Sequence, residues 1–161
     1  MKCALITNPR KYEVQQVLHQ TLAWAQDKEI HCYIDQQTAE SLTIIKSSNL
    51  HFCQGNASAI EASNLLIVIG GDGTMLYAAR LARGLEKPIL GINSGHLGFM
   101  NDVSIEEMYS ALDALIEKNY SLDYRYFLES IDQEGKLNYA LNEFLFTRRD
   151  SSSMINIDAE Y

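Results

Sequence analysis

Residues 65–74 read LLIVIGGDGT, and this stretch decides the fold. Its first half is apolar without interruption, which is the pattern of a strand in a parallel sheet that helices cover on both faces. Its second half, residues 70–74, holds three glycines and Asp72, and we call it the glycine loop. From Met75 onward apolar residues recur at helical spacing, so a helix is expected to end near Gly84. The stretch therefore predicts a strand, a loop and a helix of an α/β protein.

Short apolar runs alternate with helical patterns on both sides of this stretch. Further strands are expected at 3–7, 30–34 and 88–92, and a helix at about 11–28. A second helix is expected after Ser104 and Glu107, which have the spacing of a capping box. Residues 36–63 are interrupted by Ser, Asn and Gln, and they predict only helix and loop. We therefore expect an α/β domain with a parallel sheet over residues 1–120.

The pattern changes after about residue 120. Residues 122–131 and 137–146 read as two strands around a polar hairpin turn, and the alternation over 154–161 predicts another strand. A lone edge strand is a poor place for a domain to finish. Residues 121–161 are therefore expected to be the opening strands of a β-rich second domain that is truncated.

The charge balance limits the class of ligand. The chain has 161 residues, with 13 Lys and Arg against 21 Asp and Glu, and its formal net charge is -8. Nucleic-acid binding through phosphate neutralisation needs a basic face, so we do not expect a nucleic-acid partner. A polyanionic ligand would have to be bound locally, by backbone amides, a metal ion or a few cations.

Membrane, disulfide and metal signals are weak. No apolar run reaches the roughly 18 residues that a membrane span needs, and the N-terminal residues lack a signal-peptide layout, so a cytoplasmic protein without a membrane partner is expected. The cysteines, Cys3, Cys32 and Cys53, are odd in number, which argues against a disulfide framework. A metal site could be drawn from His31 and His51 with the neighbouring cysteines, but small apolar cysteines in strands explain the pattern better.

The glycine loop has the residues of a phosphate site. Glycines let a phosphate approach the backbone and meet amide donors at the start of a helix. Asp72 would repel phosphates, so its presence implies either a bridging Mg²⁺ or a hydroxyl whose proton it accepts. Thr74 would cap the helix or touch a phosphate. The alternative is a tight turn in which Asp72 only caps the helix.

A second glycine-containing loop follows the next expected strand. Residues 93–99, which we call the second loop, read NSGHLGF. In a parallel sheet this loop opens on the same carboxyl edge as the glycine loop, where ligands of open α/β sheets bind. Phe99 could stack on a base or fill the domain core, and His96 could bind a phosphate or only local backbone.

Taken together, the glycine loop, followed by Met75 and Leu76, and residues 88–99 resemble the N-terminal domain of NAD kinases. The GGDGT element alone also occurs in diacylglycerol and sphingosine kinases and in 6-phosphofructokinases, but both loops in this order are more specific. Residues Asn142 and Glu143 fall where the family has an Asn-Glu/Asp pair. The resemblance implies a Rossmann-like, 6-phosphofructokinase-like α/β fold for the nucleotide-binding domain.

The resemblance also implies a reaction and a set of site residues. NAD kinases transfer a phosphoryl group from ATP, or from polyphosphate in some members, to the 2′-hydroxyl of the adenosine ribose of NAD, which yields NADP. Asp72 would be the catalytic residue, an acidic side chain that activates that hydroxyl or helps to hold Mg²⁺ or another divalent cation. Phe99 would lie near the adenine, and Asn142 and Glu143 would bind the NAD ribose. The expected nucleotide-binding set is Gly71, Asp72, Gly73, Thr74, Phe99, Asn142 and Glu143, and a homodimer or homotetramer is expected.

The chain departs from the family in one respect. NAD kinases continue into a β-rich domain with a second GDG segment and a Ser/Thr-rich run, and neither is present here. The 161 residues alone are therefore expected to be inactive.

Two alternative functions stay open at this point. One is a diacylglycerol-type lipid kinase, against which the acidic net charge counts, and the other is a non-catalytic nucleotide-binding fragment. Arg148 and Arg149 could bind phosphate, but a solvated arginine pair is an equally good interpretation.

Overall fold

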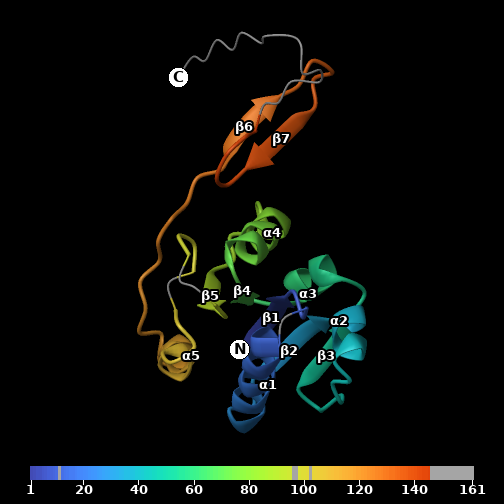
Figure 1. Ribbon diagram of the computed structural model, residues 1–161, viewed down its shortest axis with the longest axis vertical. Helices are drawn as coiled ribbons and strands as arrows, with labels where there is room; N and C mark the ends of the chain where they lie inside the picture. The colour runs from blue at the N-terminus through green and yellow to red at the C-terminus, as the bar shows by residue number, and fades with distance from the viewer. Residues whose placement is uncertain (11, 96–97, 102, 146–161) are drawn as a thin grey trace. The chain divides into compact units, whose positions relative to one another are not determined.

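The apolar run that ends in the glycine loop forms an interior strand of a parallel sheet. The computed structural model describes residues 1–10, 12–95, 98–101 and 103–145 (Figure 1). Five strands pair in the order β3-β2-β1-β4-β5, and every pair is parallel. The strands are β1 (Lys2–Thr7), β2 (His31–Asp35), β3 (Leu50–Cys53), β4 (Leu65–Gly70) and β5 (Ile89–Asn93). This order, with β1 and β4 adjacent, is Rossmann-like, and it confirms the predicted α/β fold class.

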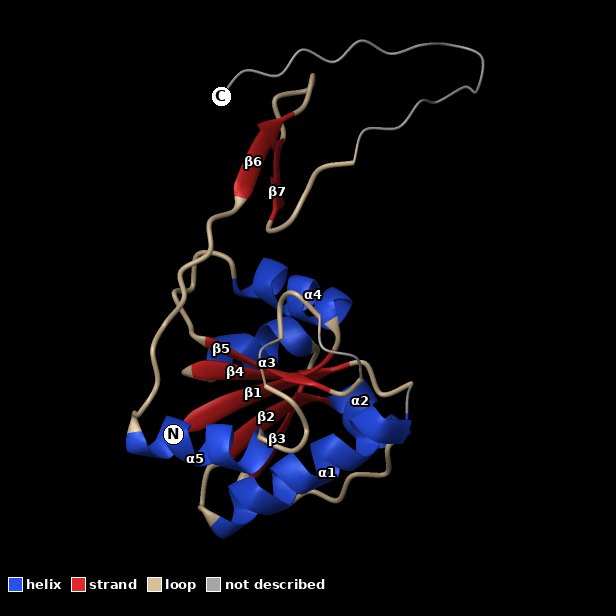
Figure 2. Cartoon of the chain, turned by 60° about the vertical axis from the view of Figure 1, so that its left-hand side comes forward, coloured by secondary structure: helices blue, strands red, loops and turns tan. Residues whose placement is uncertain are grey.

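Helices cover both faces of the sheet (Figure 2). They are α1 (Tyr12–Asp27), α2 (Gln36–Ser41), α3 (Asn56–Ala62), α4 (Asp72–Ala82) and α5 (Met108–Glu117). Helices α1 and α5 pack on the face that carries Leu5 and Ile67, whereas α3 and α4 pack on the face that carries Ile6 and Val68. The two cores lie back to back across the sheet, which is why the strands need apolar residues on both sides.

Strand β4 shows how the apolar run becomes the centre of these two cores. All six of its residues are buried, and alternate side chains enter opposite cores. Burying a side chain of the size of Leu or Ile contributes roughly 1.5 to 3 kcal/mol relative to leaving it exposed. The burial of this strand therefore fixes the position at which the glycine loop begins.

The structure corrects the starts of two helices and adds a strand that was not predicted. Helix α4 begins at Asp72 and not at Met75, because Gly71 is already its N-cap, and no side chain caps it. The predicted capping role of Thr74 is therefore wrong. Strand β3 was missed, because its middle residues are only partly buried and give no continuous apolar run. Before α5, the Ser104 backbone N–H donates to Glu107 Oε2 at 3.4 Å, which is one of the two bonds of a capping box, but the helix begins only at Met108.

The described residues divide into two compact units, which are each considered separately: the first ends at Arg125, and the second begins at Tyr126. The second unit contains an antiparallel hairpin of β6 (Leu128–Ile131) and β7 (Leu137–Ala140). Its turn is held by Asp132 Oδ1, which accepts from the backbone N–H groups of Glu134 at 3.0 Å and Lys136 at 2.8 Å. The Lys136 N–H holds the pKa of the Asp132 carboxyl below its ordinary value.

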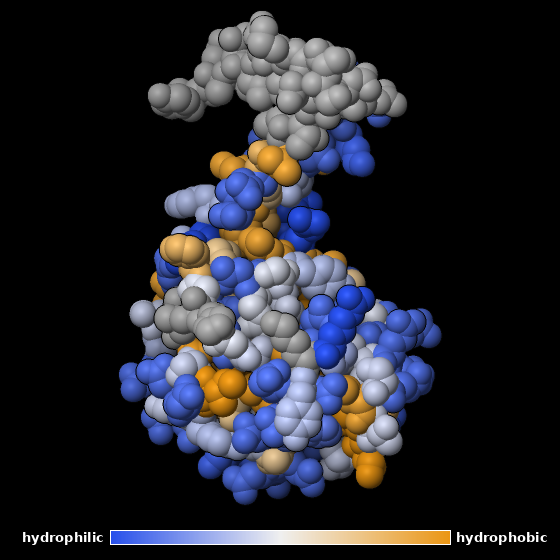
Figure 3. Space-filling model, in the orientation of Figure 1, coloured by the Kyte–Doolittle hydropathy of each residue, from blue (hydrophilic) through white to orange (hydrophobic). Residues whose placement is uncertain are grey.

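The predicted hairpin is confirmed, although both strands are shorter than expected. The division into domains at residue 120 stays a prediction, and the strand expected over 154–161 lies outside the described residues. None of the helices in the described ranges combines the length and the apolar character that a membrane span requires. The face shown in Figure 3 is largely hydrophilic, with scattered apolar side chains.

Candidate active site

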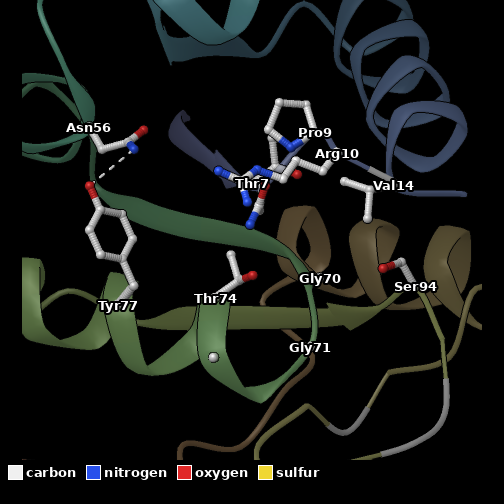
Figure 4. Close-up of a pocket in the computed structure, with 12 residues that line it drawn as sticks. Thr7, Pro9, Arg10, Val14, Asn56, Gly70, Gly71, Thr74, Tyr77 and Ser94 are labelled. Atoms are coloured by element: carbon white, nitrogen blue, oxygen red, sulfur yellow. Dashed lines mark hydrogen bonds between the residues drawn. The ribbon is translucent and has the colours of Figure 1, made fainter. Parts of the chain in front are cut away.

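A cavity of about 560 Å³ opens at the carboxyl edge of the parallel sheet (Figure 4). Its walls come from the ends of three strands and the adjoining turns of three helices. The lining residues are Thr7, Asn8, Pro9, Arg10, Val14, Asn56, Gly70, Gly71, Gly73, Thr74, Tyr77 and Ser94. The glycine loop therefore forms part of a cavity that is large enough for a nucleotide-sized ligand.

The strand order explains why the cavity lies here. The chain leaves β1 toward β2 on one side of the sheet and leaves β4 toward β5 on the other. The connections after β1 and β4 therefore diverge to opposite faces, and a crevice opens between them at their carboxyl ends. Thr7 Oγ1 donates to Ile69 O at 3.0 Å and links the two strand ends beneath the cavity.

The glycines of the glycine loop serve two different purposes. Gly70 has a φ of +155°, and a Cβ there would lie 2.6 Å from Thr74 Oγ1, so no other residue fits without displacing Thr74. Gly71 and Gly73 are exposed, and a Cβ at either position would meet nothing within 4 Å. Gly70 is therefore needed for the turn itself, whereas Gly71 and Gly73 leave the backbone open to a ligand.

Asp72 joins the glycine loop to the second loop. Its Oδ2 accepts the Phe99 N–H and its Oδ1 accepts the Met100 N–H, both at 3.1 Å. A Cβ at Gly98 would overlap the same carboxylate, so the glycine is required by this close approach. The helix N-cap makes no side-chain hydrogen bond, so the interpretation of Asp72 as a simple helix cap is wrong. Its carboxylate is instead oriented by two amides from a distant part of the chain.

Asn101, two residues after the second loop, makes a further contact with the glycine loop that was not predicted from the sequence. The side chain is fully buried, and Nδ2 donates to Gly70 O at 3.0 Å. Its Oδ1 is buried without a hydrogen-bond partner in the described part of the chain. A Cβ at Gly91 would overlap Asn101 Oδ1 and the Met75 methyl group. A polar residue after a glycine-containing loop was the only signal, and it does not reveal a contact across 31 residues.

The other predicted site residues lie in different parts of the structure. Phe99 is 94% exposed, so the alternative in which it fills the domain core is wrong, and its ring is available to a ligand. Asn142 and Glu143 belong to the second unit, follow β7, and are exposed. His96, Arg148 and Arg149 lie outside the described residues. The described structure thus brings together Gly71, Asp72, Gly73, Thr74 and Phe99.

The cavity also contains residues that the sequence analysis did not select. These are Thr7, Asn8, Pro9, Arg10, Val14, Asn56 and Tyr77. The turn after the first strand was recognised at Asn8, but only the strand order places that turn beside the glycine loop. Among the lining residues that the structure describes, Arg10 alone carries a charge. Thus the cavity wall is positive in a chain whose net charge is -8.

The structure does not support a metal site built from the cysteines. Cys32 is buried in the core beside Cys3, its partner in the β1–β2 register. His31 Nδ1 and His51 Nε2 lie 3.0 Å apart at an exposed position. Within the described ranges, no group of three or more His, Cys, Asp or Glu residues is placed to hold a metal ion. The small-apolar interpretation of Cys3 and Cys32 therefore fits the structure.

The three cysteines differ in burial, and their reactivity toward alkylating reagents should differ accordingly. It raises the pKa of the Cys3 and Cys32 thiols to about 12, so both stay protonated at pH 8. Because alkylation requires the thiolate, iodoacetamide should label neither residue in the folded protein at pH 8, and their labelling should rise only in strong alkali. Cys53 is partly exposed and should react first. Peptide mass spectrometry of native and urea-unfolded protein measures each site, and equal native and unfolded labelling of Cys3 or Cys32 would contradict this expectation.

Comparisons with known proteins agree on one family. The profile of the ATP-NAD kinase N-terminal domain matches residues 3–120. The chain is 35% identical over 161 residues to the NAD kinase of Cytophaga hutchinsonii, covering 96% of this chain and 54% of that protein. It is 45% identical over 98 residues to the NAD kinase of Bacteroides fragilis, covering 59% of this chain and 34% of the relative.

A solved structure supports the fold. Yeast NADH kinase, solved in complex with NADH, matches with a TM-score of 0.73 at 16% identity, covering 87% of this chain and 46% of that one. The chain spans about half the length of the curated relatives that it matches over most of its own length. Because the family profile covers well over half of the residues, the chain belongs to the NAD kinase family.

Proposed function

We propose that the protein is an NAD kinase, which transfers the γ-phosphoryl group of ATP to the 2′-hydroxyl of the adenosine ribose of NAD and forms NADP. The observation that carries the proposal is the position of Asp72. Asp72 stands between Gly71 and Gly73 in the chain, both of which line the cavity, and its carboxylate accepts the N–H of Phe99, whose ring is exposed. A proton acceptor, open glycine backbone and an exposed aromatic ring thus occur within one pair of loops.

The chemistry requires positioning and charge neutralisation more than covalent catalysis. Asp72 accepts the proton of the ribose hydroxyl as that oxygen bonds to the γ-phosphorus. The bond from the γ-phosphorus to the bridging oxygen breaks, and its electron pair leaves with ADP. The open backbone at Gly71 and Gly73 allows the donor phosphates to approach closely.

A divalent cation such as Mg²⁺ fits this site when the donor phosphates supply most of its ligands. Mg²⁺ is held in such sites by one or two carboxylates together with phosphates and water. Asp72 is the carboxylate that the glycine loop offers, and no larger ligand cluster is present among the described residues. When bound, the cation would neutralise charge on the phosphates.

The proposal also covers the NAD-binding residues, the oligomeric state and the cellular location. Phe99 would lie against the adenine of NAD, and Asn142 and Glu143 of the second unit would hydrogen-bond its ribose. The resemblance to NAD kinases supports these roles, a homodimer or homotetramer, and a cytoplasmic location. We extend these proposals to the protein expressed from the full reading frame of its gene.

The test offers two acceptors to that complete protein. With labelled ATP and Mg²⁺, NAD and diacylglycerol are presented side by side, and we expect label in NADP and none in lipid. Labelled lipid with unlabelled NAD would show a lipid kinase instead. Calorimetric binding of NAD or ATP without any phosphorylated product would show a non-catalytic nucleotide-binding protein.

A further inference from the structure

Residues 98–101, which we call the clamp segment, contact the glycine loop at each of their positions. Gly98 lies so close to the Asp72 carboxylate that a Cβ would overlap it, and the next two residues donate their backbone N–H groups to that carboxylate. Asn101 completes the series, because its Nδ2 donates to the carbonyl oxygen of Gly70 at 3.0 Å. Of these four residues, Asn101 alone is fully buried. The clamp segment is therefore anchored through Asn101.

Packing alone does not explain an amide at position 101. Asn101 Oδ1 is buried without a hydrogen-bond partner in the described part of the chain, and burying an unpaired acceptor is unfavourable. An apolar side chain of the same size would avoid that penalty. Room for the amide comes from Gly91, because a Cβ there would overlap Asn101 Oδ1. The interaction that the amide adds is the bond from its Nδ2 to Gly70 O.

The bond to Gly70 holds the clamp segment at the point where the glycine loop begins. Gly70 is the last residue of β4, and α4 begins at Asp72, two residues later. On the other side of Asn101, the Val103 carbonyl oxygen accepts the N–H of Asn93 at 2.8 Å, which ties the chain to the end of β5. The chain around Asn101 is therefore held against the ends of two adjacent strands.

We propose that Asn101 is a positioning residue of the kinase reaction, which fixes the clamp segment and thereby orients the Asp72 carboxylate. The proposal rests on the proposed function and deepens it. Asn101 is fully buried and is not among the residues that line the cavity, so it acts through Asp72 and not on a substrate. One amide of the clamp segment binds each carboxylate oxygen, so a shift of the segment would turn the carboxylate away from the acceptor hydroxyl.

The first test compares two variants of nearly equal volume in the complete protein. Asn101→Val removes the donor, whereas Asn101→Thr keeps a hydroxyl that can donate. With ATP and NAD as substrates, kcat should fall about tenfold in Asn101→Val, because a small misplacement of a catalytic group slows the reaction, and the KM values should stay within about twofold. Asn101→Thr should keep more of the kcat than Asn101→Val.

A double variant separates positioning from general damage. In the Asp72→Asn background, Asn101→Val should change kcat by less than about twofold, because the carboxylate that the clamp segment orients is already absent. Two independent effects would multiply, and the double variant would then lose about a further tenfold.

Asn49→Ala is the matched control. Asn49 Nδ2 donates to the carbonyl oxygens of Ala25 at 3.1 Å and Ile30 at 2.8 Å, and the residue lies outside the cavity. The replacement should lower the temperature of thermal unfolding, as Asn101→Val should, but it should leave the kcat of the folded protein unchanged.

Amide hydrogen exchange tests the same link without any substrate. The N–H groups of Phe99 and Met100 are bonded to Asp72, so both should exchange faster in Asn101→Val than in the unaltered protein. Their exchange in Asn49→Ala should be unchanged. This measurement does not depend on whether the protein is a kinase.

Several results would overturn the inference. It fails if folded Asn101→Val has a normal kcat, if the Phe99 and Met100 amides exchange normally in that variant, or if Asn101→Thr and Asn101→Val lose equal activity. It also fails if the losses multiply in the double variant or if Asn49→Ala lowers kcat as much. Normal NADP formation by Asn101→Val would keep the proposed function and reject the positioning role. Faster exchange in Asn101→Val, with no NADP formed by the unaltered protein, would keep the structural link and reject the kinase function.

Discussion

Replacing Asp72 with asparagine in the complete protein should lower kcat for NADP formation by at least about a hundredfold, the scale expected for a lost general base. An asparagine has nearly the same shape, and its carbonyl oxygen can still accept one of the two N–H groups, from Phe99 or Met100. It cannot take the proton of the ribose hydroxyl. The loss should therefore appear in kcat, with the KM for NAD changed much less.

Asp27→Asn is the matched control. Asp27 is an exposed carboxylate at the end of α1, outside the cavity, and its replacement should leave turnover unchanged. Thermal unfolding of Asp72→Asn separates a chemical loss from a structural one, since the second loop is tied to this side chain. Turnover of folded Asp72→Asn close to that of the unaltered protein would remove Asp72 from the chemistry.

Replacing Gly91 with alanine should cost about 1 to 3 kcal/mol of unfolding free energy, as overpacking of a buried site does. The new methyl group would overlap Asn101 Oδ1 and the Met75 methyl group in a buried strand paired with β4. Asn101 cannot move freely, because it is fully buried and bonded to Gly70 O, and the Met75 side chain is itself buried. Urea unfolding measures the loss, and displacement of Asn101 should also reduce turnover.

Gly73→Ala gives the contrast. A Cβ at Gly73 would meet nothing within 4 Å, and the residue lies inside α4, where alanine is favoured over glycine. Its unfolding free energy should stay the same or rise slightly. Equal destabilisation by Gly73→Ala and Gly91→Ala would show that the close packing around Gly91 is not what limits the substitution.

Local patterns were sufficient to predict the main strands and the longer helices. The apolar run of β4 can be buried on both faces only in a covered sheet, so its sequence predicted both the element and its environment. Strand β3 was not predictable in this way, because partly buried residues such as His51 leave no strong apolar signal. The start of α4 at Asp72 depends on the cap at Gly71, and residue type alone does not fix that boundary.

The site was predicted where its residues are contiguous and missed where they are not. Glycines on both sides of Asp72 identified the glycine loop. Because the second loop follows the next parallel strand, it was expected at the same carboxyl edge of the sheet. The hydrogen bonds from Phe99 and Met100 to Asp72 join residues 27 and 28 positions apart, and no local pattern reveals them. Arg10 enters the cavity only because β1 lies beside β4, which is a property of the sheet order.

The position of the transferred phosphate on NAD tests the central claim most directly. The complete protein is incubated with NAD, ATP and Mg²⁺, and the product is examined by phosphorus NMR and mass spectrometry. The account predicts a single new phosphate monoester on the 2′-hydroxyl of the adenosine ribose, together with one equivalent of ADP. An unmodified dinucleotide, or a phosphate on any other hydroxyl, would contradict it.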